Sequence, residues 1–246
     1  MKIAVNQPNY IPWLPFFNLI KKVDKFFILD NVNLGTRTYI NRSKIYLKTG
    51  TAHWLTVPIS EELKRKKLNE IKIDKNFKIK HLRSILMNLT SKSAHLKKFL
   101  EKIIVNDIDI LSKYNFNIIQ EICKFIKLDC EFVYVSEYIK SKSFDRAGDI
   151  IQHIIKSENC SEYYNFQKGV EIGLFPYNDE NFFKENNIRL FKQNLNKFIV
   201  NENHIEKFSL INYIDYSFHK YKTNEAIYNI NNNIKNHKDI FYEKIF

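Results

Sequence analysis

The sequence predicts an α/β protein with a mixed sheet, in which an N-terminal β-α-β unit, an antiparallel hairpin and a central helical insertion follow one another. Three patterns predict this class. Short apolar runs at residues 2–7 and 25–30 flank a segment whose apolar residues recur at helical spacing. Residues 36–59 alternate between apolar and polar side chains around a turn at Gly50, which is typical of a hairpin. Residues 77–127 repeat apolar side chains every three to four positions, as helices do.

The N-terminal unit places two polar residues at what we expect to be one edge of the sheet. The strand over residues 2–7 ends before a proline, and the helical spacing of residues 14–23 leads into the strand over residues 25–30. If the two strands are parallel neighbours, Gln7 and Asp30 lie at their carboxyl ends. Open α/β sheets bind their ligands at that edge.

The rest of the chain is expected to mix helices and strands within one domain. The expected elements are a strand at 68–73, a strand at 131–135, a helix at 145–156, an extended segment at 163–165, a helix at 179–185, a strand at 188–191 and helical structure from 209 onward. Because no glycine- or proline-rich linker divides the chain, we expect a single α/β domain over residues 1–221. The helical insertion spans 77–127, and a helical tail follows at 222–246.

Glycine is scarce, which excludes two ways of binding nucleotides. The 246 residues contain 5 glycines, where average usage would give about 17. Neither a glycine-rich dinucleotide fingerprint nor a Walker-type phosphate loop can be built from them. Any phosphate must therefore be held by side chains or helix ends.

The formal charge of +12 comes mainly from lysine. Of the 39 lysines and arginines only 6 are arginines, and the abundance of Lys, Ile and Asn is what an AT-rich coding sequence gives any protein. We therefore interpret most of the charge as a solvated surface. The sequence contains no recognisable nucleic-acid-binding motif, so no nucleic-acid partner is expected. A homo-oligomer is left open.

Cysteine use and hydropathy predict a cytoplasmic protein. Cys123, Cys130 and Cys160 are odd in number and form no C-x-x-C motif, which favours free thiols in a reducing compartment. The N-terminus shows no signal-peptide core, and no apolar run reaches the length of a membrane span. We expect no membrane insertion.

The sequence gives little support for a metal site. The seven histidines show neither H-x-H nor H-x-x-x-H spacing. Asp107 and Asp109 have the spacing with which some nucleotide-sugar enzymes hold a divalent cation, but in a helix their side chains would diverge. We expect no metal.

Polar and aromatic residues suited to ligand binding gather in the first quarter of the chain. They are Gln7, Tyr10, Asp30, Asn31, Asn33, Arg37, Asn41, Arg42 and Trp54. In a chain that prefers lysine, composition does not explain an arginine, and the guanidinium fork suits phosphate or carboxylate. Arg37 and Arg42 are therefore ranked above any lysine as anion ligands. Ion pairs on an exposed strand explain them equally well.

Three residues are candidates for catalysis. Asp30, at the end of an apolar strand, suits a general base or a substrate anchor, although an Asx turn with Asn31 is at least as common. Gln7 suits a hydrogen bond to a ligand amide or hydroxyl, or to backbone at the strand end. His81 lies near a helix start, where a lone histidine is more often structural or solvated than catalytic.

Several motifs in order resemble one known family, the WbqC-like protein family. They are Gln7-Pro8-Asn9-Tyr10-Ile11-Pro12, Asp30 after an apolar strand, Asn41-Arg42-Ser43-Lys44-Ile45 and Trp54-Leu55-Thr56-Val57-Pro58, with Tyr177, Phe182, residues 188–191 and residues 208–214 in the second half. The resemblance covers about residues 1–221. The chain departs from the family at 166–169, where a Gly-Gly pair is common, and at 198–200, where a Tyr with a nearby Gln is common.

The resemblance implies a place in bacterial gene clusters that build O-antigen, capsule or related surface glycans. The implied activity is a transferase that places an acyl or aminoacyl group on the amine of a nucleotide-linked amino sugar, with an acyl or aminoacyl donor that the sequence does not name. The implied roles are Arg37 and Arg42 as diphosphate ligands, Asp30 or His81 as base, Gln7, Asn41 or Tyr10 as oxyanion donors, Trp54 or Trp13 as stacking residues, and Tyr164 and Asn165 as further substrate contacts. The alternatives are a glycosyltransferase-like enzyme using Asp107 and Asp109 with Mg²⁺ or Mn²⁺, and a noncatalytic carbohydrate- or nucleotide-binding factor.

Overall fold

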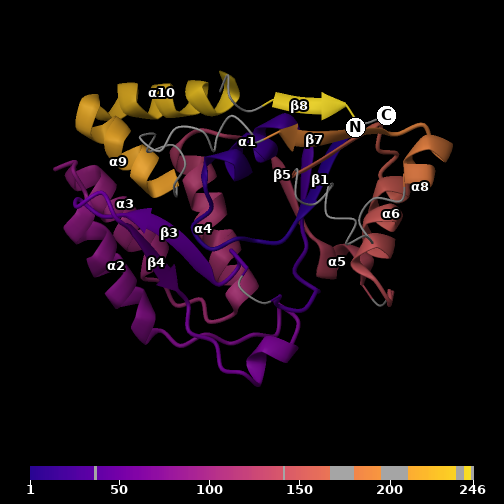
Figure 1. Ribbon diagram of the computed structural model, residues 1–246, viewed down its shortest axis with the longest axis horizontal. Coiled ribbons are helices and arrows are strands. Elements are labelled where there is room, and N and C mark those ends of the chain that lie inside the picture. Colours follow the sequence, from indigo (N-terminus) through magenta and orange to yellow (C-terminus); the bar gives the residue numbers. More distant parts are fainter. Residues whose placement is uncertain (36–37, 141, 167–179, 195–209, 237–240, 245–246) are drawn as a thin grey trace.

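A six-stranded sheet runs through the middle of the molecule, with helices on both sides (Figure 1). The computed structural model describes residues 1–35, 38–140, 142–166, 180–194, 210–236 and 241–244. In spatial order the strands are β5 (Glu131–Tyr134), β2 (Lys25–Ile28), β1 (Lys2–Asn6), β6 (Glu162–Phe166), β7 (Arg189–Asn194) and β8 (Phe241–Lys244). The first five strands are parallel and β8 is antiparallel to β7. The predicted mixed α/β class is confirmed.

The sheet is wound in both directions from its central strand. From β1 the chain passes through α1 (Leu14–Lys22) to β2 and later to β5, and it then returns through α6 (Ala147–Ser157) to β6 on the other side of β1. The strand order therefore reverses between β1 and β6. Ligands of such sheets bind beside the carboxyl ends of the strands at this reversal.

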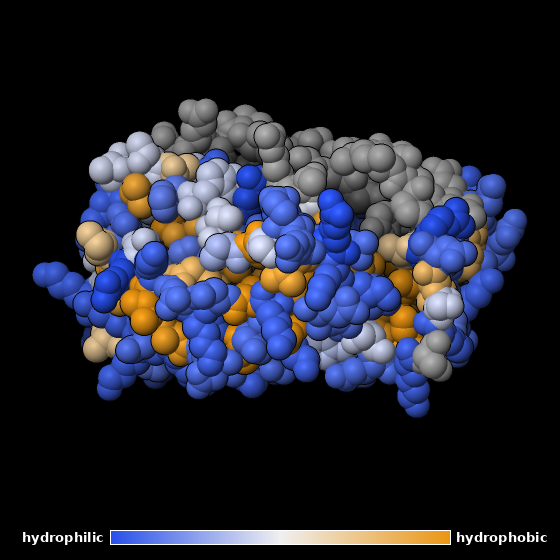
Figure 2. Space-filling view, turned by 90° about the horizontal axis from the view of Figure 1, so that it is seen from below, coloured by the Kyte–Doolittle hydropathy of each residue, from blue (hydrophilic) through white to orange (hydrophobic). Residues whose placement is uncertain are grey.

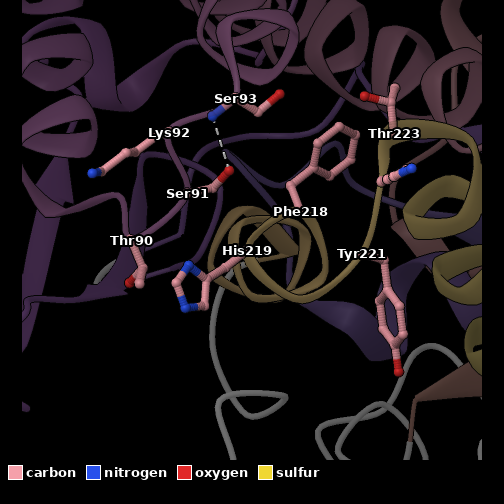
Figure 3. A pocket seen from close by; sticks show the side chains of 9 residues that line it. Thr90, Ser91, Lys92, Ser93, Phe218, His219, Tyr221 and Thr223 are labelled. Carbon is pink, nitrogen blue, oxygen red and sulfur yellow. Dashed lines mark hydrogen bonds between the residues drawn. The ribbon is translucent and has the colours of Figure 1, made fainter.

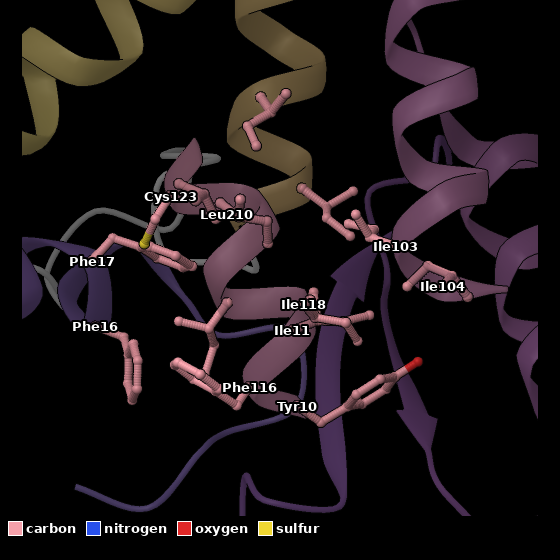
Figure 4. Packing of buried hydrophobic residues seen from close by; sticks show 14 of the residues in the cluster. Tyr10, Ile11, Phe16, Phe17, Ile103, Ile104, Phe116, Ile118, Cys123 and Leu210 are labelled. Carbon is pink, nitrogen blue, oxygen red and sulfur yellow. The ribbon is translucent and has the colours of Figure 1, made fainter. Parts of the chain in front are cut away.

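Alternating residues of the strands divide the core into two clusters, one on each face of the sheet. Ala4 of β1 packs with α1, α4 (Leu111–Phe125), α9 (Leu210–Lys220) and α10 (Thr223–Asn236). Its neighbours Ile3 and Val5 pack with α5 (Val135–Ile139), α6 and α8 (Glu180–Glu185) on the other face. Figure 4 shows part of the larger cluster, in which side chains of α1, α4 and α9 meet.

The helical insertion forms three separate helices: α2 (Asn76–Asn88), α3 (Ala94–Ile104) and α4. Buried Lys78 stabilises the connection between α3 and α4. Its Nζ donates to the carbonyl oxygens of Asn106 at 2.8 Å and Ile108 at 2.6 Å. The predicted hairpin is also present, as β3 (Arg42–Tyr46) and β4 (Ala52–Thr56) in a sheet of their own.

Residues 68–73, expected to be a strand, do not form one. A short 3₁₀ helix, η1 (Leu63–Arg65), comes before them. Leu68 and Asn69 then donate their backbone N–H groups to the carbonyl oxygens of Val32 and Asp30, at 2.9 and 3.0 Å. This segment therefore pairs with the loop that follows β2 and does not extend a sheet.

The C-terminal segment combines helices with a strand that the sequence pattern did not predict. After α9 and α10 the chain reaches β8, whose residues pair with β7 from Phe191↔Lys244 to Asn194↔Phe241. Seen from below, the surface is mainly hydrophilic, with apolar residues visible between the polar side chains (Figure 2). Within the described residues, no helix has both the length and the apolar character that crossing a membrane requires.

Candidate functional site

Asp30 lies at the carboxyl end of β2, as predicted, and its carboxylate is bound by Ser136, the second residue of α5. Its Oδ1 accepts the backbone N–H of Ser136 at 2.9 Å, and its Oδ2 accepts the Ser136 hydroxyl at 2.6 Å. Asp30 itself is only 2% exposed. Ser136 therefore contacts a buried carboxylate and also lines a cavity.

Above Ser136 is a cavity of about 530 Å³, within the size range of small-ligand sites. It is lined by Asn31, Val32, Asn33, Lys67, Asn69, Glu70, Ser136, Ile139, Lys140, Lys142, Ser143, Phe144, Asp145, Arg146, Ala147 and Ile150. Four of these side chains are cationic and two are acidic, so the lining favours anions. We call it the strand-end cavity.

Two of the cations in the strand-end cavity are engaged by neighbouring side chains. Arg146 is paired with Asp149 at 2.9 Å, and Lys142 Nζ lies 3.3 Å from His153 Nε2. The ammonium of Lys142 helps to lower the pKa of His153, after the effect of burial. Residues of α6 therefore hold two of the four cations that line the cavity.

Two residues that line this cavity each have a buried amide oxygen without a hydrogen-bond partner. These oxygens are Oδ1 of Asn31 and Oδ1 of Asn69, and both atoms are buried. The two residues lie on adjacent segments, because the Asn69 N–H donates to the Asp30 carbonyl next to Asn31. An unpaired buried acceptor costs stability.

Gln7 directly follows β1 and is half-buried at the same edge of the sheet. The segment after it is fixed by Asn115 of α4, whose Nδ2 donates to the carbonyl oxygens of Pro8 at 2.9 Å and Ile40 at 2.7 Å. Asn41 is also half-buried, and its carbonyl accepts the Val57 N–H at 2.7 Å. Neither Gln7 nor Asn41 lines the strand-end cavity.

Tyr10 and His81 meet in the interior. The Tyr10 hydroxyl lies 2.8 Å from His81 Nδ1 in a hydrogen bond, and the rings of Phe77 and Tyr114 surround the pair. Tyr10 is 1% exposed and His81 is 9% exposed. Burial lowers the pKa of His81 to about 4, with a further lowering by His53, so the ring is neutral at pH 7. This position suits a structural role, and a catalytic role for either residue stays a prediction.

The hairpin brings Arg42 and Trp54 together on its outward face. The Arg42 guanidinium carbon lies 4.4 Å from the centre of the Trp54 ring, and Tyr39 is 5.9 Å away on the same surface. Trp54 is 38% exposed. Arg37 lies outside the described residues. The arrangement is a cation–aromatic surface, but none of these side chains lines the strand-end cavity.

Tyr164 and Asn165 belong to β6, and their side chains serve the sheet. The Tyr164 hydroxyl donates to Glu162 Oε2 at 2.6 Å, and its ring stacks on Phe191 of β7. Burial raises the pKa of Tyr164, and Glu162 raises it further. Asn165 Oδ1 accepts the backbone N–H of Phe166 at 2.8 Å. Trp13 immediately precedes α1 and is half-buried.

Asp107 and Asp109 lie in the connection between α3 and α4, and not within a helix. Asp107 pairs with Lys75 at 3.0 Å, and this contact lowers the pKa of Asp107. The backbone carbonyls beside it are already bound by Lys78, whose pKa burial lowers to about 8. Across the described ranges, no three His, Cys, Asp or Glu side chains come together in a way that could hold a metal ion.

A second cavity, of about 440 Å³, lies between the α2–α3 connection and the junction of α9 with α10 (Figure 3). Its lining is Thr90, Ser91, Lys92, Ser93, Phe218, His219, Tyr221, Lys222 and Thr223. None of the predicted site residues lines it. It is formed by helices at the periphery, whereas the strand-end cavity lies at the carboxyl ends of β2 and β5. That is the edge of the sheet that binds ligands in such folds, although the cavity lies beside the β1–β6 reversal and not at it.

The WbqC-like protein family matches the chain over residues 7–225, which is most of its length. The chain belongs to this family. This WbqC-like protein is also 28% identical over 166 residues to Rv1507c, an uncharacterized protein of Mycobacterium tuberculosis. The similarity covers 65% of this chain and 71% of the mycobacterial protein. No solved structure matches the chain significantly.

The site of this WbqC-like chain includes residues that the sequence analysis missed. Ser136, Asn69 and Lys140 line the strand-end cavity but were not candidates. A signal was present for Ser136, because it is a polar residue directly after the predicted strand at 131–135, and Asp30 is the polar residue that ends the predicted strand at 25–30. No comparable signal marks Asn69, which reaches the cavity by pairing with an irregular loop.

Proposed function

We propose that this WbqC-like protein is a transferase of bacterial surface polysaccharide biosynthesis that places an acyl or aminoacyl group on the amine of a nucleotide-linked amino sugar. One observation carries the proposal. The strand-end cavity combines cationic side chains with a serine that is hydrogen-bonded to a buried carboxylate. Family membership supports the link to surface polysaccharide, because the family resemblance implies it.

The cations of the cavity suit the diphosphate of such a substrate. Lys67, Lys140, Lys142 and Arg146 line it, and the chain contains no glycine-rich phosphate loop. Lysine and arginine side chains bind phosphate through charge-assisted hydrogen bonds. Ser136 lies on α5, and Lys140 and Lys142 follow directly after this helix. The proposed phosphate ligands and the reacting serine are therefore close together in the chain.

The Asp30–Ser136 pair suits the removal of a proton from the sugar ammonium. The ammonium would donate a proton to Ser136 Oγ while the Ser136 hydroxyl proton passes to Asp30 Oδ2. The neutral amine then forms a C–N bond with the carbonyl carbon of the donor. The leaving group departs with the bonding electron pair and takes up the second proton that the nitrogen loses. General bases are most effective when they reach the reacting proton directly or through one intervening group.

Arg42 and Trp54 lie on the hairpin surface, which is separate from the lining of the strand-end cavity, and Arg37 lies outside the described residues. All three stay predicted nucleotide contacts. The noncatalytic alternative, a carbohydrate- or nucleotide-binding factor, would use the same cavity without turnover. A binding measurement alone does not separate the two functions. The test must therefore detect product.

The test begins with thermal shift measurements against nucleotide sugars and acyl or aminoacyl donors, followed by mass spectrometry of mixtures that stabilise the protein. We expect a product whose mass equals that of the amino sugar nucleotide plus the carboxylic acid that corresponds to the acyl group, less one water. Asp30→Asn and Ser136→Ala should each lower kcat at least about 100-fold, the scale of a lost general base.

Glu101→Gln is the matched control for Asp30→Asn, since Glu101 is an exposed carboxylate on α3. Ser84→Ala on α2 is the control for Ser136→Ala. Both controls should keep full turnover. Stabilisation by nucleotide sugars with no product under any donor would instead establish the noncatalytic function, and full turnover by folded Asp30→Asn would remove Asp30 from the mechanism.

A further inference from the structure

We propose that the outward face of helix α2 docks on the surface of a bilayer that contains anionic phospholipid. The helix exposes five residues, which together we call the α2 face: Asn76, Ile79, Lys80, Arg83 and Met87. The inference concerns attachment to a membrane surface and not a span of the bilayer. It uses no residue of the strand-end cavity, so it does not depend on the proposed transferase activity.

Helical geometry places the α2 face on one side of α2. Its five residues follow one another at intervals of three, one, three and four positions, and residues three or four apart are neighbours on a helix surface. The other side of the helix packs into the core through Phe77, Leu82 and Ile85. Because α2 lies at one end of the molecule (Figure 1), the α2 face is directed to solvent.

Apolar side chains are exposed on the α2 face. Ile79 is 48% exposed and Met87 is 74% exposed, which is the largest value among the exposed large apolar side chains of the described residues. Half-buried Leu86 lies seven positions after Ile79, on the same side of the helix. Contact with water is unfavourable for these groups, whereas the boundary between lipid headgroups and acyl chains accepts them.

Cations lie on the same face, and no acid accompanies them. Lys80 and Arg83 are both exposed and lie between Ile79 and Met87 in the sequence. Residues 75–100 contain seven lysines and arginines and neither Asp nor Glu, although the chain's average of 27 acids in 246 residues would place about three there. A coding bias toward lysine acts on the whole chain and does not remove acids from one stretch. The positive charge is therefore concentrated locally.

Neighbouring segments add to this charge. Among the seven cations, Lys75 pairs with Asp107 at 3.0 Å and Lys78 is buried, and the other five are exposed. They are Lys80 and Arg83 on α2, Lys92 before α3, and Lys97 and Lys98 on α3. The hairpin, which is hydrogen-bonded to the end of α2, likewise contains no acid over residues 38–60.

A bilayer suits this combination better than a nucleic acid does. Nucleic acid would also attract the cations, but it provides no apolar phase for Ile79 and Met87. At an anionic bilayer the headgroups attract lysine and arginine, each of which contributes about a fivefold gain in affinity, and the apolar side chains enter the headgroup boundary. The long side chains of Lys80 and Arg83 keep their charges at the headgroups while their stems lie along apolar surface.

The test is cosedimentation of the full chain with large unilamellar vesicles. One set contains phosphatidylcholine alone and the other also contains about 30% phosphatidylglycerol, both at roughly 0.1 M NaCl. We expect at least about 10-fold tighter binding to the phosphatidylglycerol vesicles, and weaker binding as the salt concentration rises.

Charge variants test the cations. Lys80→Gln combined with Arg83→Gln should weaken binding to the phosphatidylglycerol vesicles at least about 10-fold. The matched control is Lys156→Gln combined with Lys184→Gln, which removes two exposed lysines of α6 and α8 at the other end of the molecule (Figure 1). The control should bind these vesicles within about twofold of the parent protein.

Apolar variants separate a bilayer from other polyanions. Ile79→Ser combined with Met87→Ser should weaken binding to the phosphatidylglycerol vesicles at least about threefold and leave binding to duplex DNA unchanged. Tyr228→Ser, at an exposed tyrosine of α10, is the control and should bind as the parent protein does. Met87→Trp keeps an apolar side chain on the α2 face. Its fluorescence should shift to shorter wavelength when these vesicles are added, and that of Tyr228→Trp should not.

Equal binding to both vesicle sets, binding to DNA without binding to vesicles, or vesicle binding that both double variants of α2 retain overturns the inference. If a double variant does not fold, as judged by circular dichroism, the emission of Met87→Trp decides, and an unshifted emission overturns the docking site. Loss of binding in both double variants, with retention in both controls, supports it. The transferase proposal is tested separately, by product formation.

Discussion

At the scale of single residues, the sequence could identify Asp30 but not its partner. A polar residue directly after an apolar strand marks the carboxyl edge of a sheet, and this local rule is enough to select Asp30. Ser136, 106 positions further along the chain, binds it because β5 lies beside β2 in the same sheet. Which strands become neighbours is decided by packing across the whole chain, and no local pattern contains that information.

His81 illustrates how burial changes the meaning of a residue. The sequence allowed a structural, solvated or catalytic histidine, and the structure shows a buried side chain that contacts the rings of Tyr10 and Phe77. The neutral ring is required for this environment, because the charged form would lose its hydration. The pH dependence of stability follows directly.

Stability should fall as the pH drops from 6.5 to 4. Burial lowers the pKa of His81 from 6.5 to about 4, so in this window the unfolded chain binds a proton that the folded chain excludes. The loss should reach up to about 3 kcal/mol of the free energy of unfolding. Urea denaturation at several pH values measures it. His81→Gln should flatten the dependence, and Gln in place of exposed His219 should not. Identical slopes for His81→Gln and the parent protein would contradict this assignment.

At the scale of elements, α9 stabilises two segments that come much earlier in the chain. Asp215 accepts the backbone N–H groups of Thr90 and Ser91, each at 2.8 Å, in the connection between α2 and α3. One turn earlier on α9, Asn212 pairs with both the N–H and the C=O of Tyr46 at the edge of β3. Helix α9 therefore connects the hairpin to the helical insertion through side-chain hydrogen bonds.

Removing the carboxylate of Asp215 should weaken the contact between α9 and the α2–α3 connection and destabilise the protein. Asp215→Ala leaves two N–H groups without their acceptor and should lower the free energy of unfolding by about 3 kcal/mol. Asp215→Asn keeps one acceptor oxygen, so it should lose less. Chemical denaturation measures both, with Glu101→Ala on the exposed surface of α3 as the control. A loss no larger than that of the control would show that the two hydrogen bonds contribute nothing net.

Periodicity predicted most elements because their residues contact the core at regular intervals. The strands near residues 2–7, 25–30 and 131–135 are apolar runs. The structure places the first two inside the sheet and the third at its edge. Residues 68–73 have a similar pattern but pair with a loop, so burial alone produced the apolar spacing there. The breaks between α2, α3 and α4 depend on capping at Ser93 and on the contacts of Lys78, which periodicity does not register.

At the scale of the whole molecule, the C-terminal strand completes the sheet. Residues 222–246 were expected to be a helical tail, yet Tyr242 of β8 reaches the core. Its hydroxyl donates to Asn18 of α1 at 2.9 Å and accepts from Gln193 of β7 at 3.0 Å. The sequence could not show this, because a four-residue strand at a chain end is too short for a periodic signal.

Truncating Tyr242 should therefore destabilise the protein as a whole. Tyr242→Ala removes a ring that packs against Tyr164 and takes one hydrogen bond each from Asn18 and Gln193, so we expect a loss of about 3 to 4 kcal/mol in unfolding free energy. Tyr242→Phe removes only the hydroxyl and should cost about 1 kcal/mol. Tyr228→Ala, at an exposed tyrosine of α10, is the control. An Ala variant as stable as this control would mean that β8 is dispensable for the fold.

The central position of β1 affects how the chain folds during synthesis. β1 pairs with β2 within the first thirty residues, but its other edge pairs with β6, with Ile3 opposite Tyr163. At typical bacterial and eukaryotic rates of about 5–20 residues per second, a ribosome needs roughly 8 to 32 s to add the intervening residues. During that time the emerging chain presents an unpaired, apolar strand edge, which is the kind of surface that holding chaperones bind.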